Sequence, residues 1–101
     1  MHLSFAHIAC ANPGRLINRL CKHWGHKFPV ELDDALGRIE LPIGECRLRD
    51  AGERLEAQLQ AADAAALARL QQVVADHLER MASGEALTIV WQPGESGRAT
   101  A

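Results

Sequence analysis

Apolar and polar residues alternate along six short stretches of the chain, and this period of two predicts β-strands with one buried face. Five of the stretches cover residues 2–10, 28–33, 38–41, 46–49 and 54–60, and the sixth covers residues 87–92. The second to fifth stretches follow one another closely and are separated by residues typical of turns. This spacing favours an antiparallel meander in the middle of the chain.

Two longer stretches have apolar residues three and four positions apart, which predicts amphipathic helices. The first helix should begin after Asn12, a good N-cap residue that is followed by proline, and run to about residue 26. The second should begin after Asp63 and run to about residue 82. Its apolar stripe consists of Leu67, Leu70, Val74, Leu78 and Met81.

These elements predict the order β-α-β-β-β-β-α-β. The fold class that we expect is α+β, a two-layer sandwich in which an antiparallel sheet carries both helices on one face. The helices should then meet through one apolar stripe each. Residues 1–92 would form a single domain, and the small, polar segment 93–101 is typical of a disordered tail.

The composition agrees with one globular domain, because 48% of the 101 residues are hydrophobic and 24% are charged. No apolar run approaches the length of a membrane span, and the first residues lack the pattern of a secretory signal. We therefore expect a cytoplasmic protein that does not contact a membrane. Three cysteines at irregular spacing, without a C-x-x-C pair, argue against a disulfide framework and against zinc ribbons.

Charge is spread unevenly along the chain. The first 30 residues carry four basic residues and no acid, whereas the remainder carries a net charge of −6. Such asymmetry can mark an anion-facing surface, but a solvated helix face is the simpler explanation. The candidate anion-binding residues are Arg15, Arg19, Lys22 and Lys27, which lie on the first helix or directly after it. Four basic residues would give weak, salt-sensitive binding.

The outer face of the predicted sheet carries charges of both signs and no aromatic residue. A sheet that binds RNA needs exposed rings on which bases can stack, so nucleic acid is not an expected partner of this face. The residues that we place there are Glu31, Arg38, Glu40, Arg47, Arg49, Glu56 and Gln58.

Histidine and cysteine residues cluster near the end of the first helix. His23 and His26 lie three positions apart, so they share a helix face and could share a metal ion with a ligand from elsewhere. Cys21 and His77 are the further candidate ligands, and they would also be a Cys–His nucleophile candidate if the helices bring them together. The structural alternatives are a small core residue for Cys21, helix-end charges for His23 and His26, and a hydrogen-bonded rim position for His77.

Several segments together resemble a small bacterial family called domain of unknown function 2218. They are LCKHWGHK at 20–27, GRIE at 37–40, GECRL at 44–48, AADAAAL at 61–67, DHLER at 76–80 and LTIVW at 87–91. The resemblance covers about residues 4–92, and only the segment 81–86 departs from the more aromatic stretch expected there. Members of this family stand alone or lie at the C-terminus of flavin-binding siderophore-interacting proteins. The resemblance therefore implies a loose tie to iron handling, with such a flavoprotein or a second copy of the chain as partner, and it assigns no catalytic residue.

The chain lacks phosphate loops, paired catalytic carboxylates and a nucleophile elbow. The sequence thus favours a non-catalytic interaction or ligand-binding module over an enzyme, and it identifies neither the ligand nor a cofactor. Two alternatives stay open. One is a metal- or haem-binding accessory protein that uses the histidines of the first helix, and the other is a weak anion or nucleic-acid binder that uses its basic residues.

Overall fold

The computed structural model describes residues 2–33, 36–82 and 84–95, and within these ranges the elements follow the predicted order. They are β1 (His2–Ala9), α1 (Pro13–Gly25), β2 (Val30–Leu32), β3 (Leu36–Leu41), β4 (Gly44–Asp50), β5 (Arg54–Ala61), α2 (Ala64–Met81) and β6 (Gln92–Glu95). Both helices begin as predicted. The side chain of Asn12 accepts a hydrogen bond from the backbone N–H of Arg15, and that of Asp63 accepts one from Ala66.

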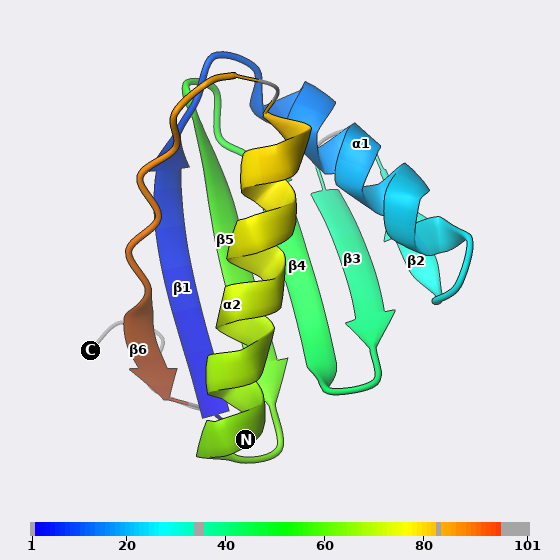
Figure 1. The fold of residues 1–101 in the computed structure, drawn as a ribbon, viewed down its shortest axis with the longest axis vertical. Coiled ribbons are helices and arrows are strands. Elements are labelled where there is room, and N and C mark those ends of the chain that lie inside the picture. The colour runs from blue at the N-terminus through cyan, green and yellow to red at the C-terminus, as the bar shows by residue number, and fades with distance from the viewer. Residues whose placement is uncertain (1, 34–35, 83, 96–101) are drawn as a thin grey trace.

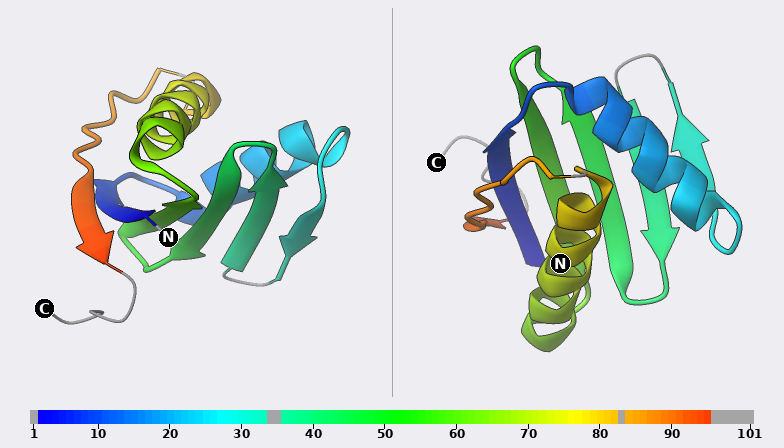
Figure 2. Two further views of the ribbon diagram at one scale, coloured as in Figure 1. Left: turned by 90° about the horizontal axis from the view of Figure 1, so that it is seen from below. Right: turned by 45° about the horizontal axis from the view of Figure 1, so that its top comes forward.

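The six strands form one antiparallel sheet in the order β2-β3-β4-β5-β1-β6. The strands β2 to β5 are the predicted meander, and β1 lies between β5 and β6. Both helices cover the same face of the sheet, with α1 over the β2–β4 side and α2 over the β5 side (Figures 1 and 2). The α+β two-layer sandwich is therefore confirmed. In the part of the chain that the structure describes, no helix covers the opposite face.

The core lies between the helices and the sheet, and it is continuous from one helix to the other. Trp24 of α1 is only 6% exposed, and its ring centre lies 4.7 Å from that of His77 on α2. Nearby, the Arg19 guanidinium donates a hydrogen bond of 2.8 Å to the backbone carbonyl of Met81 at the end of α2. The two helices thus meet through the buried Trp24, as the apolar stripes predicted, but also through Arg19, which was expected on the exposed polar side of α1.

Cys21 is a core residue, as the structural interpretation predicted, and Cys46 is another. Both are buried and unpaired, and Cys21 lies over β3, where a side chain at Gly37 would collide with its sulfur. Burial raises the pKa of the Cys21 thiol. The thiol is therefore protonated at neutral pH, which disfavours a nucleophilic role.

The predicted last strand was wrong in position. Residues 87–91 run beside the core without strand pairing, and β6 begins at Gln92, which pairs with Phe5 of β1. Leu87, Ile89 and Trp91 pack against the core in an extended chain, so their alternation reflects burial on one side rather than a hydrogen-bonded ladder. Residues 93–95, which were expected in the disordered tail, belong to β6 instead. The rest of the expected tail, residues 96–101, lies outside the described ranges. Pro93 is tolerated because β6 is an edge strand.

Candidate functional site

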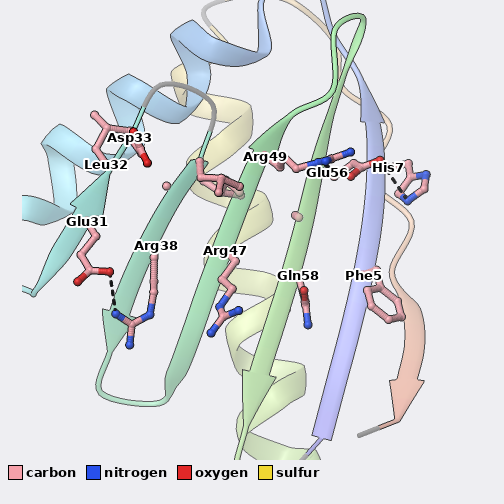
Figure 3. A pocket seen from close by; sticks show the side chains of 14 residues that line it. Phe5, His7, Glu31, Leu32, Asp33, Arg38, Arg47, Arg49, Glu56 and Gln58 are labelled. Carbon is pink, nitrogen blue, oxygen red and sulfur yellow. Dashed lines mark hydrogen bonds and ion pairs between the residues drawn. The ribbon is translucent and has the colours of Figure 1, made fainter. Parts of the chain in front are cut away.

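The open face of the sheet carries two rows of polar side chains that cross several strands. In the first row, Phe5 pairs with Gln58, Gln58 with Arg47, Arg47 with Arg38, and Arg38 with Glu31. In the second row, His7 pairs with Glu56 and Glu56 with Arg49. Residues paired directly across strands point to the same face, so both rows project away from the helices (Figure 3).

These rows line a hollow of about 730 Å³, a size within the range of small-molecule sites. The side chains around it include Phe5, Arg47, Gln58, Glu56 and His7, drawn in Figure 3. Leucines at the β2–β3 end add apolar lining, and they are the exposed residues Leu32 and Leu36. The hollow therefore combines charged groups in its middle with apolar groups at its ends.

Arg38 is saturated by carboxylates. Its three guanidinium nitrogens donate to Glu45 at 2.7 Å, to Glu31 at 3.0 Å and to Glu40 at 3.1 Å. Arg38 also stands directly opposite Arg47, and two like charges in that position repel each other. Glu45 resolves this conflict because its second carboxylate oxygen accepts from Nε of Arg47, also at 2.7 Å. Arg38 thus holds three carboxylates of the face in place, one with each of its nitrogens.

Arg47 and Arg49 differ from Arg38 because each uses Nε alone. Arg47 donates from Nε to Glu45, and Arg49 donates from Nε to Glu56 at 3.0 Å. Their side chains are 57% and 58% exposed, and their terminal nitrogens have no partner among the described residues. Each guanidinium is thereby oriented by one carboxylate while its two end nitrogens face the solvent. Such ends are suited to bidentate binding of a carboxylate or phosphate group.

The two carboxylates that orient these arginines hold their protons weakly. Partial burial raises the pKa of Glu45, but hydrogen bonds from Arg38 and Arg47 and the charges of both outweigh it, so the pKa lies below its usual value. Desolvation also raises the pKa of Glu56, but hydrogen bonds from Arg54 and Arg49 and the charge of Arg49 outweigh it, so this pKa too lies below its usual value. Both groups are ionised at neutral pH and keep the arginines in place.

Acidification is expected to destabilise the fold through these groups. A carboxyl whose pKa is lower in the folded than in the unfolded state adds stability above the unfolded value, about 4.3 for Glu, and this stability disappears as the pH falls through the folded pKa. The free energy of unfolding should therefore decline below about pH 5. Urea unfolding at several pH values between 7 and 3 measures the decline. In Glu45→Gln, the free energy of unfolding should decline less steeply with falling pH than in the wild-type chain. The control Glu79→Gln, at an exposed position of α2, should show the wild-type slope. Equal slopes for all three proteins would contradict the role of Glu45.

The sequence placed six charged residues and Gln58 on this face correctly, but it missed Glu45 as well as Phe5 and His7, and the expectation of a face without aromatic residues was wrong. In β1 the buried residues are Ser4, Ala6 and Ile8. Small side chains there allow α2 to pack closely, and Gln71 of α2 donates a hydrogen bond of 3.0 Å to the Ser4 hydroxyl. Because Phe5 is apolar and lies in an alternating strand, the pattern alone suggests that it faces the core. The small size of Ser4 and Ala6 was the signal that these residues, and not Phe5, lie under a helix.

The basic residues of α1, together with Lys27 just after it, do not form one uniform surface. Arg15, Lys22 and Lys27 are exposed, as the sequence suggested. Arg19 is half-buried and its guanidinium contacts Met81, so it contributes to the packing of the two helices.

The fold brings two of the four candidate metal ligands together and separates the other two from them. His23 lies beside His77, with ring centres 5.3 Å apart, whereas His26 is exposed at the end of α1 and Cys21 is buried against β3. No group of three or more His, Cys, Asp or Glu side chains within the described ranges is arranged to hold a metal ion. His77 is half-buried and bonded to the Val73 carbonyl, in the rim position that the structural interpretation predicted.

Comparisons with known proteins give two matches and one negative result. Residues 5–92 match the model of a family described as uncharacterized protein conserved in bacteria, DUF2218. The fold is similar to the NMR structure of PA4090 from Pseudomonas aeruginosa, with a TM-score of 0.80, 45% sequence identity, and coverage of 94% of this chain and 99% of that chain. No curated protein matches the chain. Neither helix of the described residues is long and apolar enough to cross a membrane.

Proposed function

The chain belongs to the bacterial family of uncharacterized proteins whose model it matches, and from its site we propose that it is a non-catalytic module that binds a small organic anion on the open face of the sheet. The observation that carries this proposal is the hollow of about 730 Å³ in which the terminal nitrogens of Arg47 and Arg49 have no partner in the part of the chain that the structure describes. Two oriented guanidinium ends can bind a carboxylate without breaking the ion pairs that hold them.

Directed donors, rather than net charge, would provide the affinity. Arginines and glutamates balance one another on this face, so the face attracts anions only weakly at a distance. Close to the surface the situation changes, because the terminal nitrogens of Arg47 and Arg49 have no carboxylate partner among the described residues, and both side chains are more than half exposed. This arrangement favours a compact ligand that enters the hollow over an extended polyanion.

The apolar parts of the hollow indicate that the ligand has an apolar part beside its acid group. Phe5 and Arg47 lie on strands two apart in the sheet, roughly 10 Å from backbone to backbone. A single aromatic ring with one carboxylate can bridge this span, with the ring beside Phe5 and Gln58 and the carboxylate at Arg47. The ligand class that fits is therefore a small aromatic or otherwise partly apolar organic acid.

The resemblance to domains attached to siderophore-interacting flavoproteins suggests which acids to test first. Iron-chelating molecules often carry catechol or carboxylate groups, and either could be held by the arginines of this face. A role beside such a flavoprotein would then be to bind the organic acid that carries or releases iron. The suitable probes are 2,3-dihydroxybenzoate, which has a ring and a carboxylate, and citrate, which has carboxylates only.

Binding should depend on Arg47 and Arg49. Each of the variants Arg47→Ala and Arg49→Ala is expected to weaken 2,3-dihydroxybenzoate binding about tenfold or more, since a hydrogen bond to a charged group contributes roughly 1.5–3 kcal/mol. Isothermal titration calorimetry gives the dissociation constants, and amide NMR shifts locate the site. Citrate should bind more weakly than 2,3-dihydroxybenzoate because it offers no ring to Phe5.

Two controls make the result specific. Arg69→Ala removes an exposed arginine of α2 and should leave the affinity unchanged. Arg15→Ala with Lys22→Ala removes exposed charges of α1 and tests the rival anion surface. Binding lost in that double variant but kept in Arg47→Ala, or the absence of any shift on β1, β4 and β5 at millimolar probe, would overturn the proposal.

A further inference from the structure

Three aromatic rings meet where the C-terminal parts of α1 and α2 approach each other, on the helix side of the molecule and away from the hollow. The ring centre of His77 lies 4.7 Å from that of Trp24 and 5.3 Å from that of His23. Trp24 is buried, His77 is half-buried and His23 is exposed. The cluster therefore runs from the core to the solvent, with the two histidines at its outer end.

His77 is held in one tautomer by its own helix. Its Nδ1 lies 2.7 Å from the backbone carbonyl of Val73, and because a carbonyl only accepts, Nδ1 carries the proton in this contact. In the neutral ring, Nε2 then has the free lone pair, and it has no partner among the described residues. A hydrogen bond from one ring nitrogen to a backbone carbonyl is also the usual support of a histidine that binds metal through the other nitrogen.

The separation of the two rings suits a shared ion. Zinc lies about 2.0–2.1 Å from a histidine nitrogen, which places it roughly 3.2 Å from the ring centre. Two rings at a tetrahedral angle around one ion then have centres about 5.2 Å apart. The 5.3 Å between His23 and His77 agrees with this value. His23 makes no hydrogen bond or ion pair within the described ranges, so its ring is available for binding.

From this geometry we propose that His23 and His77 bind one Zn²⁺ ion between the two helices. No third His, Cys, Asp or Glu joins them in the described part of the chain, so water or an external ligand completes the coordination. Such a site holds an exchangeable ion, unlike a structural zinc site with four protein ligands. The two residues come from different helices, and neither His26 nor Cys21 takes part.

Zinc titration of the untagged, intact chain tests the proposal. His23→Ala and His77→Gln should each weaken the Zn²⁺ affinity at least about tenfold, whereas His26→Ala, the matched control three positions along α1, should change it less than twofold. Since Zn²⁺ would link α1 to α2, the melting temperature of the wild-type chain should rise with zinc concentration, and the rise should vanish in His23→Ala. His23 is exposed, so this variant keeps the fold even where a change at His77 does not.

A second measurement locates the ion by its distance from Trp24. In a Trp91→Phe background, Cu²⁺ should bind at the same histidines and quench the fluorescence of Trp24, which lies beside His77. Quenching that saturates at one equivalent and disappears in His23→Ala supports the site. Zinc binding lost in His26→Ala but retained in His23→Ala, or no binding at millimolar Zn²⁺, would overturn it. None of these outcomes depends on the anion site, because Arg47 and Arg49 lie on the opposite face of the sheet.

Discussion

Replacing Trp24 by alanine is expected to lower the free energy of unfolding by about 3–5 kcal/mol, the usual cost of truncating a buried aromatic residue. Trp24 is 6% exposed and lies in the last turns of α1, against His77 of α2. A domain of this size has a total stability of about 5–15 kcal/mol, so the variant loses a large share of it. Urea unfolding followed by circular dichroism measures the loss.

His23→Ala serves as the control for this variant, because His23 is the exposed neighbour of Trp24 on the same helix. Surface changes of this kind shift stability by no more than about 0.5 kcal/mol. A loss below about 1 kcal/mol for Trp24→Ala would mean that the indole does not fill the space between the helices. It would also contradict the position of His77 on which the proposed metal site rests.

The second large effect is expected at Gly37, where α1 packs on β3 without room for a side chain. A Cβ at this position would lie 2.8 Å from Sγ of Cys21 and 2.9 Å from Cγ2 of Ile17. Gly37→Val should therefore lower the free energy of unfolding by about 1–3 kcal/mol, the range for overpacked cores. The expected cause is displacement of α1 from the sheet, since both colliding side chains belong to that helix.

A double-mutant cycle isolates this contact. Cys21→Ala removes the nearer colliding atom, so Gly37→Val should cost less in that background, with a coupling energy of about 0.5–3 kcal/mol. Gly25→Ala is the matched control, because its new Cβ would lie 4.0 Å from Val30, an ordinary contact, and no loss is expected. Additive effects of Gly37→Val and Cys21→Ala would show that the helix does not sit over Gly37.

The family membership also follows from residues that are readable in the sequence. The resemblance over about residues 4–92 is confirmed by the family model, which matches residues 5–92. Its segments lie on elements with different tasks in the fold. LCKHWGHK contributes Trp24 to the core and His23 to the ring cluster, whereas GECRL contributes Cys46 to the core and Arg47 to the open face. The signature therefore spans both faces of the molecule and does not by itself single out one site.

The sequence by itself determined both helices, the strands β1 to β5, the order of the elements, the helix caps and the polar character of the meander's outer face. These features depend on local rules, because a period of two or of three to four and a capping residue act within a few positions of the chain. Glu31, Arg38, Arg47 and Glu56 could be assigned to one face for this reason. Cys21 and Trp24 lie three positions apart on α1 and are both buried, so the buried face of this helix also follows a local period.

Only the tertiary structure decided which distant residues meet. The place of β1 between β5 and β6 put Phe5 and His7 into the hollow, because α2 packs on the small residues of the other face of β1. The crossing of the helices brought His23 to His77, and the position of β6 was set by the free edge of β1 rather than by its own pattern. Such contacts join residues far apart in the chain, and their geometry depends on how whole elements pack, which no local periodicity encodes.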